Sequence, residues 1–363
     1  MQSVVEQEDQ GRDAAASGPS LDPSGRDAWR ITALLWAVAA VFGVIAVARS
    51  QQVGIPFRDP NGQMFRGRLV SAAELLVVLA LLDGLVRGHW RGRGRRGVRG
   101  SARAVLDTLR ERWTLRRVGL VVSGLLAYHV VYISYRNLKS WDAFNGPRDR
   151  DLLDLDRTLF LGHSPAVLLH DLLGTDTAAV VLADIYRSFT YLVVLSVAGT
   201  LALLPRVREA YVMLVAGVWV WILGITSYYL VPSLGPFASA PSEFAGLRHT
   251  AITDSQVKYL AERTHLLAAP QASDAFASIS AFASLHVAFT TTILLVAVYY
   301  RWRKTAVALG VYVAAVMVST VYFGWHFVLD DIAGVVIAVL AVALARLMVH
   351  GPRMRGRERT GEA

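Results

Sequence analysis

Three apolar runs stand close together near the end of the chain: LHVAFTTTILLVAVYY (residues 285–300), TAVALGVYVAAVMVSTVYF (305–323) and IAGVVIAVLAVALARLMV (332–349). Each run approaches the length of about 20 mostly apolar residues that a helix needs to cross a bilayer core. Only a few residues separate one run from the next. The pattern therefore predicts a membrane hairpin followed by a third span that returns across the membrane.

Similar runs occur upstream, so we expect about eight spans and an all-α, polytopic membrane helix bundle. The other five runs are Ile31–Arg49, Leu69–Val86, Val118–Ser134, Ala178–Leu204 and Ala210–Val231. The composition agrees, because 54% of the residues are hydrophobic and only 18% are charged, against about 25% charged in a typical soluble protein. The stretch Asp151–Leu173 is apolar but broken by Gly162, His163 and Pro165, and it predicts an interfacial or re-entrant helix.

Lysine and arginine gather in four places, which predicts the orientation of the spans. With eight spans and a cytoplasmic N-terminus, all four groups fall on the cytoplasmic side, as positive charge beside spans usually does. They are Arg87–Arg117, Pro205–Glu209, Arg301–Lys304 and Arg353–Arg359. We therefore expect a plasma-membrane protein with both termini inside, whose net charge of +9 reflects topology and lipid contact rather than nucleic acid.

The chain divides into four parts on this interpretation. Residues 1–30 form a disordered cytoplasmic tail, 31–117 two spans with a basic loop, 118–349 a catalytic membrane domain with a six-helix core, and 350–363 a basic tail. There is no cysteine, which excludes disulfides and thiolate metal sites. No cofactor is predicted, and the oligomeric state is left open.

Two weak motifs could indicate a cofactor or a metal, but neither is convincing. Gly92, Gly94 and Gly97 match a dinucleotide-binding spacing, but every residue between them is arginine and no strand precedes them. The acidic residues of segment 151–156, Asp151, Asp154 and Asp156, suit the charge of a helix start better than a metal site.

Two histidines and one aspartate are the candidate catalytic residues. His286 opens the run 285–300 and His326 precedes the run 332–349, so counting spans brings both to the outer end. His326 and Asp330 are four residues apart, which places them on one helical face. A carboxylate bound to one imidazole nitrogen leaves the other free to attack, and His286 suits general acid–base work.

Structural roles are the simpler interpretation of the remaining histidines and of Asp331. A histidine beside a span is usually an amphipathic anchor or a satisfied packing residue, and Asp331 points away from the His326 face and suits the interface. These histidines are His89, His129, His163, His170, His249, His265 and His350.

The arrangement of the candidate catalytic residues resembles that of the type 2 phosphatidic acid phosphatase (PAP2) superfamily and, more narrowly, of its branch of inositolphosphotransferases similar to inositol phosphorylceramide synthase. Ser284-Leu285-His286 resembles the second motif, His326 with Asp330 the third, and Tyr229–Phe237 the proline-rich segment of that branch. The resemblance covers about residues 130–349. It implies a phosphohistidine at His326, a proton donor at His286 and an orienting carboxylate at Asp330.

The sequence departs from the superfamily at its first motif, a lysine and a later Arg-Pro, which is missing. Thr320 stands at the arginine position of the third motif. Phosphate contacts must then come from other residues. Our candidates are Ser284 and Gly324, which suit close approach of an oxyanion, and the cations Arg136, Lys139 and Arg187. The alternatives are snorkelling of Arg136 and Lys139 and a structural pair between Asp184 and Arg187.

We expect a metal-independent enzyme that transfers a phosphoryl group from a lipid phosphoester at the outer membrane face. Water as acceptor would make it a lipid phosphatase, and an alcohol would make it a phosphotransferase. The sequence leaves both open. A non-enzymatic lipid-binding or transport protein on the same scaffold is the alternative.

Overall fold

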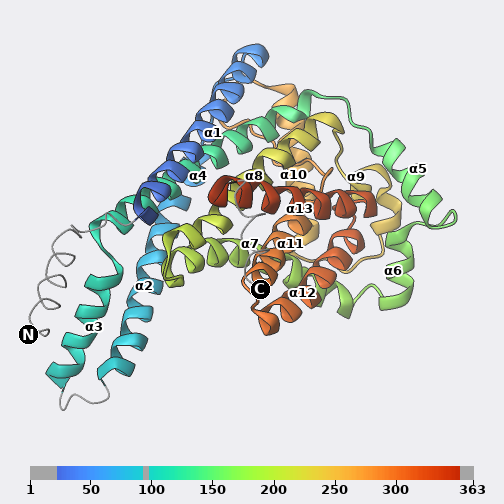
Figure 1. Ribbon diagram of the computed structural model, residues 1–363. Coiled ribbons are helices and arrows are strands. Elements are labelled where there is room, and N and C mark those ends of the chain that lie inside the picture. The colour runs from blue at the N-terminus through green and yellow to red at the C-terminus, as the bar shows by residue number, and fades with distance from the viewer. Residues whose placement is uncertain (1–22, 93–97, 352–363) are drawn as a thin grey trace, which may run out of the picture.

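The computed structural model describes residues 23–92 and 98–351, and every regular element in this part of the chain is helical (Figure 1). The helices are α1 (Pro23–Val53), α2 (Arg68–Gly92), α3 (Val98–Arg112), α4 (Leu115–Trp141), α5 (Asp149–Leu159), α6 (Pro165–Leu173), α7 (Thr177–Leu203), α8 (Val207–Leu230), α9 (Pro236–Ser239), α10 (Ala251–Ala268), α11 (Leu285–Tyr299), α12 (Arg303–Tyr322) and α13 (Val328–His350). Short turns of 3-10 or π-helix join some of them.

The predicted all-α membrane bundle is confirmed. Seven of the described helices are long and apolar enough to cross a membrane, namely α1, α2, α4, α7, α8, α12 and α13. The eighth expected span is the apolar helix α11, whose 15 residues reach about 22 Å and so fall short of a full crossing. The protein is therefore an integral membrane protein.

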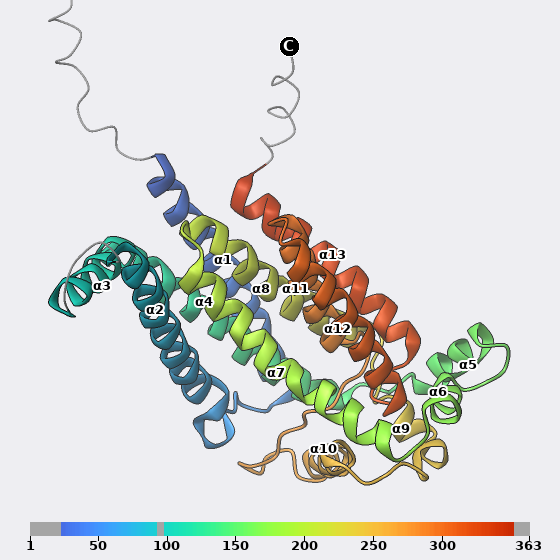
Figure 2. The ribbon, with the colours of Figure 1, turned by 90° about the horizontal axis from the view of Figure 1, so that it is seen from below.

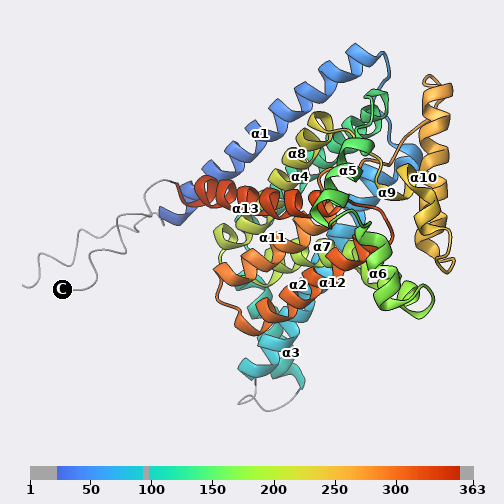
Figure 3. The ribbon, with the colours of Figure 1, turned by 90° about the vertical axis from the view of Figure 1, so that its right-hand side faces the viewer.

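The long helices alternate in direction and lie side by side (Figure 2). Contacts join the start of α8 and the end of α11 to the end of α13 at one end of the bundle. The Tyr299 hydroxyl lies 3.0 Å from Nε2 of His350, and Nε of Arg208 donates to the Val349 carbonyl at 3.2 Å. The shorter helices α5, α6, α9 and α10 gather at the opposite end (Figures 2 and 3).

Helix α8 is the centre of the bundle. Residues 210–218 are all buried, and the helix packs against α4, α7, α11 and α13. A helix that is apolar on every face belongs inside a bundle and not at its lipid-facing surface. Because both α4 and α11 pack on α8, this helix sets their positions relative to each other.

Three boundaries differ from the sequence-based expectation. Helix α1 begins at Pro23, so residues 23–30 are helical and not disordered. Segment 151–173 forms two helices, α5 and α6, because the chain turns through left-handed conformations at Leu161 and Gly162. The predicted terminal tails and the glycine motif lie largely outside the described residues, at 1–22, 352–363 and 93–97.

Candidate functional site

The starts of two helices place the histidine pair. Ser284 is the N-cap of α11 and its hydroxyl accepts from the amide of Val287, so His286 lies in the first turn of that helix. His326 lies directly before α13, which begins at Val328. The two imidazole rings are 5.8 Å apart between centroids. The structure therefore brings together the histidines that span counting placed at one end.

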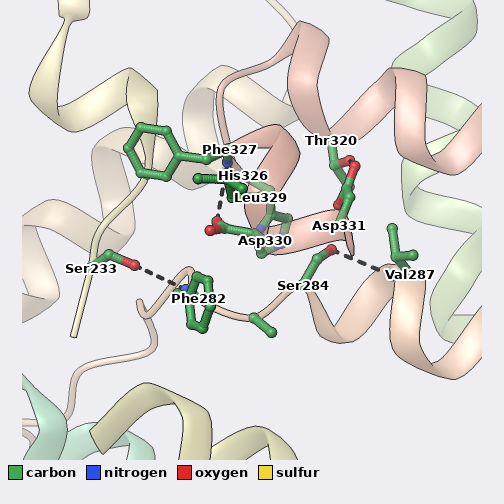
Figure 4. Close-up of polar contacts among 12 residues, drawn as sticks. Ser233, Phe282, Ser284, Val287, Thr320, His326, Phe327, Leu329, Asp330 and Asp331 are labelled. Carbon is green, nitrogen blue, oxygen red and sulfur yellow. Dashed lines mark hydrogen bonds and ion pairs between the residues drawn. The ribbon is translucent and has the colours of Figure 1, made fainter. Parts of the chain in front are cut away.

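Asp330 holds the His326 ring in place. Its Oδ2 lies 3.3 Å from Nδ1 of His326 and also accepts the backbone amide of Phe327 at 3.1 Å (Figure 4). The Asp330 side chain is 0% exposed and His326 is 5% exposed, so water does not compete for this contact. With Nδ1 facing the carboxylate, Nε2 is the nitrogen left for chemistry.

Burial also decides the charge of His326. Desolvation lowers its pKa well below the ordinary value of 6.5, and the nearby His286 and Lys139 lower it further. The imidazole is therefore neutral at physiological pH and keeps a lone pair.

Hydrogen bonds from serines fix the loop that leads into α11. The Ser233 hydroxyl accepts the amide of Phe282 at 2.9 Å (Figure 4). The Ser227 hydroxyl accepts the amide of Ala283 at 2.9 Å. The amide of Ser284 in turn donates to the carbonyl of Asp330 at 3.0 Å. These bonds fix the segment before α11 and join it to the first turn of α13, which sets the two histidines relative to each other.

Two carboxylates on α5 complete this support, and the sequence analysis missed both. Asp156 accepts the amide of Val328 at 2.8 Å and of Leu329 at 3.3 Å, which are free donors at the start of α13. Asp149 accepts the amide of Gly235 at 2.8 Å. Asp156 was interpreted as helix-start charge of its own segment. It is instead 2% exposed and caps a helix that lies far along the sequence.

A close backbone crossing brings the loop before α9 against the His326 segment. Gly235 has φ +106°, and a Cβ there would lie 2.6 Å from the carbonyl oxygen of Trp325. The amide of Phe237 donates to the carbonyl of Gly324 at 3.0 Å. Gly324 has φ +66° and packs against Phe244. A glycine is thus needed at position 324 for the turn and for the packing.

A cavity of about 1550 Å³ contains both histidines in its wall. Aromatic side chains line its inner part, including Tyr186, whose ring centroid lies 4.3 Å from that of His286. Five cationic side chains of Arg or Lys also line it, and no Asp or Glu does so among the described residues. They are Arg66, Arg68, Arg136, Lys139 and Arg187. The cavity therefore suits an anionic ligand.

The predicted phosphate-binding residues fall into two groups in space. Arg136, Lys139 and Arg187 all line the cavity. Ser284 and Gly324 do not, so their contact with substrate stays a prediction. No ion pair within 4 Å joins Asp184 to Arg187 in the described part of the chain, and a phosphate-binding role for Arg187 stays a prediction.

Asp331 corrects another expectation. Its side chain is 1% exposed and its Oδ2 accepts the hydroxyl of Thr320 at 2.9 Å (Figure 4). It therefore lies in the core between α12 and α13 and not at the membrane interface. The residue at the superfamily's arginine position is thus engaged with a buried carboxylate.

Residues 150–344 match a family described as the PAP2 superfamily. The match covers more than half of the chain and includes His286, His326 and Asp330. It begins in α5 and ends in α13, so α1 to α4 lie outside it. The narrower resemblance to inositolphosphotransferases stays a prediction. No curated protein and no solved structure matches the chain.

Proposed function

Because this chain belongs to the PAP2 superfamily, we propose that it is a membrane-embedded phosphoester-transfer enzyme acting on a lipid phosphoester. The observation that carries the proposal is the contact of 3.3 Å between Asp330 and His326, made beside His286 in a cavity walled by cations. An oriented neutral imidazole facing such a cavity is the arrangement of an activated nucleophile.

In the proposed reaction, Nε2 of His326 attacks phosphorus and the bond from phosphorus to the leaving oxygen breaks. His286 takes up a proton when the anionic phosphoester binds beside it and gives that proton to the leaving oxygen, so that an alcohol leaves. Neutral His286 then takes a proton from the incoming acceptor, whose oxygen attacks the phosphohistidine and frees His326. Asp330 stabilises the positive charge that His326 gains.

The predicted phosphate-binding cations Arg136, Lys139 and Arg187 supply charge stabilisation in this proposal. Lys139 is close enough to His326 to lower the pKa of that imidazole. Preorganised cations stabilise the charge that develops on the transferring phosphoryl oxygens. We propose that the reaction needs no metal and that the site faces outward from the plasma membrane, opposite the arginine-rich end.

The identity of the acceptor distinguishes two enzymes. Water as acceptor releases inorganic phosphate, whereas the hydroxyl of an inositol or sugar lipid gives a new phosphoester. We propose transfer to an alcohol, as in the inositolphosphotransferase branch that the proline-rich segment Tyr229–Phe237 resembles.

The test uses the purified full-length protein in detergent with a panel of lipid phosphates, with and without candidate alcohol acceptors and with EDTA. Phosphate release and new phospholipids are both measured. We expect turnover that survives EDTA and is lost in His326→Ala. The matched control is His163→Ala, because His163 is exposed and lies outside the cavity.

Acid-quenched protein should also contain a phosphohistidine that His326→Ala lacks. Release of phosphate without transfer to any alcohol would identify a phosphatase. Absence of both reactions from every lipid would refute the enzyme and favour a lipid-binding or transport protein.

A further inference from the structure

Four of the five cavity cations come from outside the family match. Arg66 and Arg68 belong to the turn and helix start that follow α1, and Arg136 and Lys139 belong to α4. The N-terminal helices thus contribute side chains to the cavity that holds the histidine pair.

Hydrogen bonds fasten the segment before α2 to the bundle. The Asn137 amide group accepts the amide of Arg58 at 2.8 Å and donates to its carbonyl at 3.0 Å. The Arg58 guanidinium donates to the carbonyls of Pro270 and Ala275. Asp59 then accepts the amide of Met64 at 2.7 Å and orders the turn before α2. These hydrogen bonds therefore fix the position of the backbone that carries Arg66 and Arg68.

One face of α4 lines the cavity and sets the spacing between its cations. Leu125, Tyr128, His129, Tyr132, Tyr135, Arg136 and Lys139 line the cavity, at the three- and four-residue spacing of a single helical face. The guanidinium of Arg68 lies 4.6 Å from the ring centre of Tyr132. From Tyr132 to Lys139 the helix advances about 10 Å. Arg68 thus marks a second cationic position, about 10 Å along α4 from Lys139.

Protein carboxylates make no direct ion pair with these cations in the described part of the chain. No ion pair among the described residues includes Arg66, Arg68, Arg136, Lys139 or Arg187. Arg68, Arg136 and Lys139 rest instead against aromatic rings, those of Tyr132, Phe276 and Tyr228. Such contacts hold a cation without cancelling its charge. Five basic side chains without a direct ion pair are more than one phosphoryl group at the histidines needs.

The cavity opens at the lipid-facing side of the bundle, where α2 and α7 form its wall. Val70 on α2 is 48% exposed, Leu195 on α7 is 49% exposed, and both line the cavity. An apolar chain lying in the bilayer can enter at this opening. A headgroup that follows it would meet the Arg68 position before it reaches the histidines.

We propose that Arg66 and Arg68 form a second anion subsite, which binds a phosphate-type group located in the substrate between its apolar chains and the phosphoester that reacts. This inference rests on the proposed function and names its substrate class: a phospholipid with two separated anionic groups. The distal phosphoester lies at His326 and Lys139, and the proximal phosphodiester at Arg68.

Binding tests this subsite without turnover. His326→Ala protein in detergent micelles is titrated with phosphatidic acid, which has one phosphate, and with phosphatidylglycerol phosphate, which adds a phosphodiester. Tryptophan fluorescence reports occupancy, because Trp221 and Trp325 line the cavity. We expect tighter binding of the lipid with two phosphates, by about tenfold or more, as charged hydrogen bonds contribute.

The double variant Arg66→Gln, Arg68→Gln should abolish this preference and leave the affinity for phosphatidic acid within about twofold. The variant with lysine at both positions should keep most of the preference, which shows that the cation and not the fold is responsible. Arg248→Gln is the matched control, because Arg248 pairs with Asp176 and does not line the cavity.

Several results would overturn the subsite. The subsite is refuted if the double variant loses affinity equally for both lipids or keeps the preference for the lipid with two phosphates. It is also refuted if the His326→Ala parent protein shows no such preference. Wild-type turnover is measured in parallel. If the two arginines cause the preference for the lipid with two phosphates but no lipid is turned over, the subsite stands and the proposed enzyme is refuted. If lipids are turned over but the double variant keeps the preference, the enzyme stands and the subsite is refuted.

Discussion

Asp156 caps the helix that carries Asp330, because its carboxylate accepts the backbone amide of Val328 at 2.8 Å. The cap comes from α5, which lies outside the long-helix bundle (Figure 2). A short helix at the end of the bundle therefore sets the position of the nucleophile's support.

Asp156→Asn tests this relationship. The amide keeps one acceptor but loses the charge that the free amides at a helix start favour, so we expect the protein to lose about 1 kcal/mol of stability. We expect kcat to fall at least about tenfold with little change in KM, since a displaced nucleophile lowers the rate more than binding. Thermal unfolding and steady-state kinetics measure the two effects. Asp154→Asn is the control, because that side chain is exposed and should change neither quantity.

The pH dependence of kcat/KM tests the charge state of His326. Burial lowers the pKa of this imidazole below 6.5, so the neutral, nucleophilic form persists as the pH falls through that value. We expect no loss of activity from His326 between pH 8 and about 6.5, with its acid limb at lower pH. Two substrates whose phosphates titrate at different pH separate the enzyme's limb from their own. An enzyme limb centred at or above 6.5 would contradict a buried neutral histidine.

Gly235→Ala tests the backbone crossing beside His326. The new Cβ would meet the Trp325 carbonyl, and φ +106° disfavours any residue with a side chain. We expect a loss of about 1–3 kcal/mol in stability and reduced activity. Gly246→Ala serves as the comparison, because a Cβ there has no neighbour within 4 Å. Equal melting temperatures for the two variants would show that the crossing can relax.

Arg117→Gln tests how the end of α7 is held. The Arg117 guanidinium donates to the carbonyls of Leu201, Leu204 and Pro205 at 2.9, 2.7 and 3.0 Å. Its loss leaves these acceptors without a buried donor, which costs about 1–3 kcal/mol. Thermal unfolding in detergent measures the change. Arg116→Gln should be neutral, because Arg116 is exposed. A neutral Arg117→Gln would mean that water or lipid headgroups replace the guanidinium.

Cysteine labelling in intact cells tests the orientation. The chain has no cysteine, so single substitutions report one position each. We expect Thr264→Cys on α10 to react with a membrane-impermeant maleimide and Arg303→Cys at the start of α12 to react only after permeabilisation. The reverse pattern would place the histidines on the cytoplasmic side. Both side chains are exposed, so a lack of labelling at either reflects the membrane and not burial.

The sequence by itself determined the membrane bundle, the positions of the eight apolar helices and the pairing of His326 with Asp330. These features are local, because hydropathy and a four-residue spacing act within one helix. It also predicted that His286 and His326 meet, since antiparallel spans return the chain to the same end.

Only the tertiary structure decided what surrounds that pair. Asp156 caps α13 from a distant helix, and Arg68 reaches the cavity from a segment outside the family match. No periodicity marks such contacts, because they depend on how separate helices dock. The burial of Asp331 against Thr320 was missed for the same reason: its surroundings come from α12, and the sequence near it describes only α13.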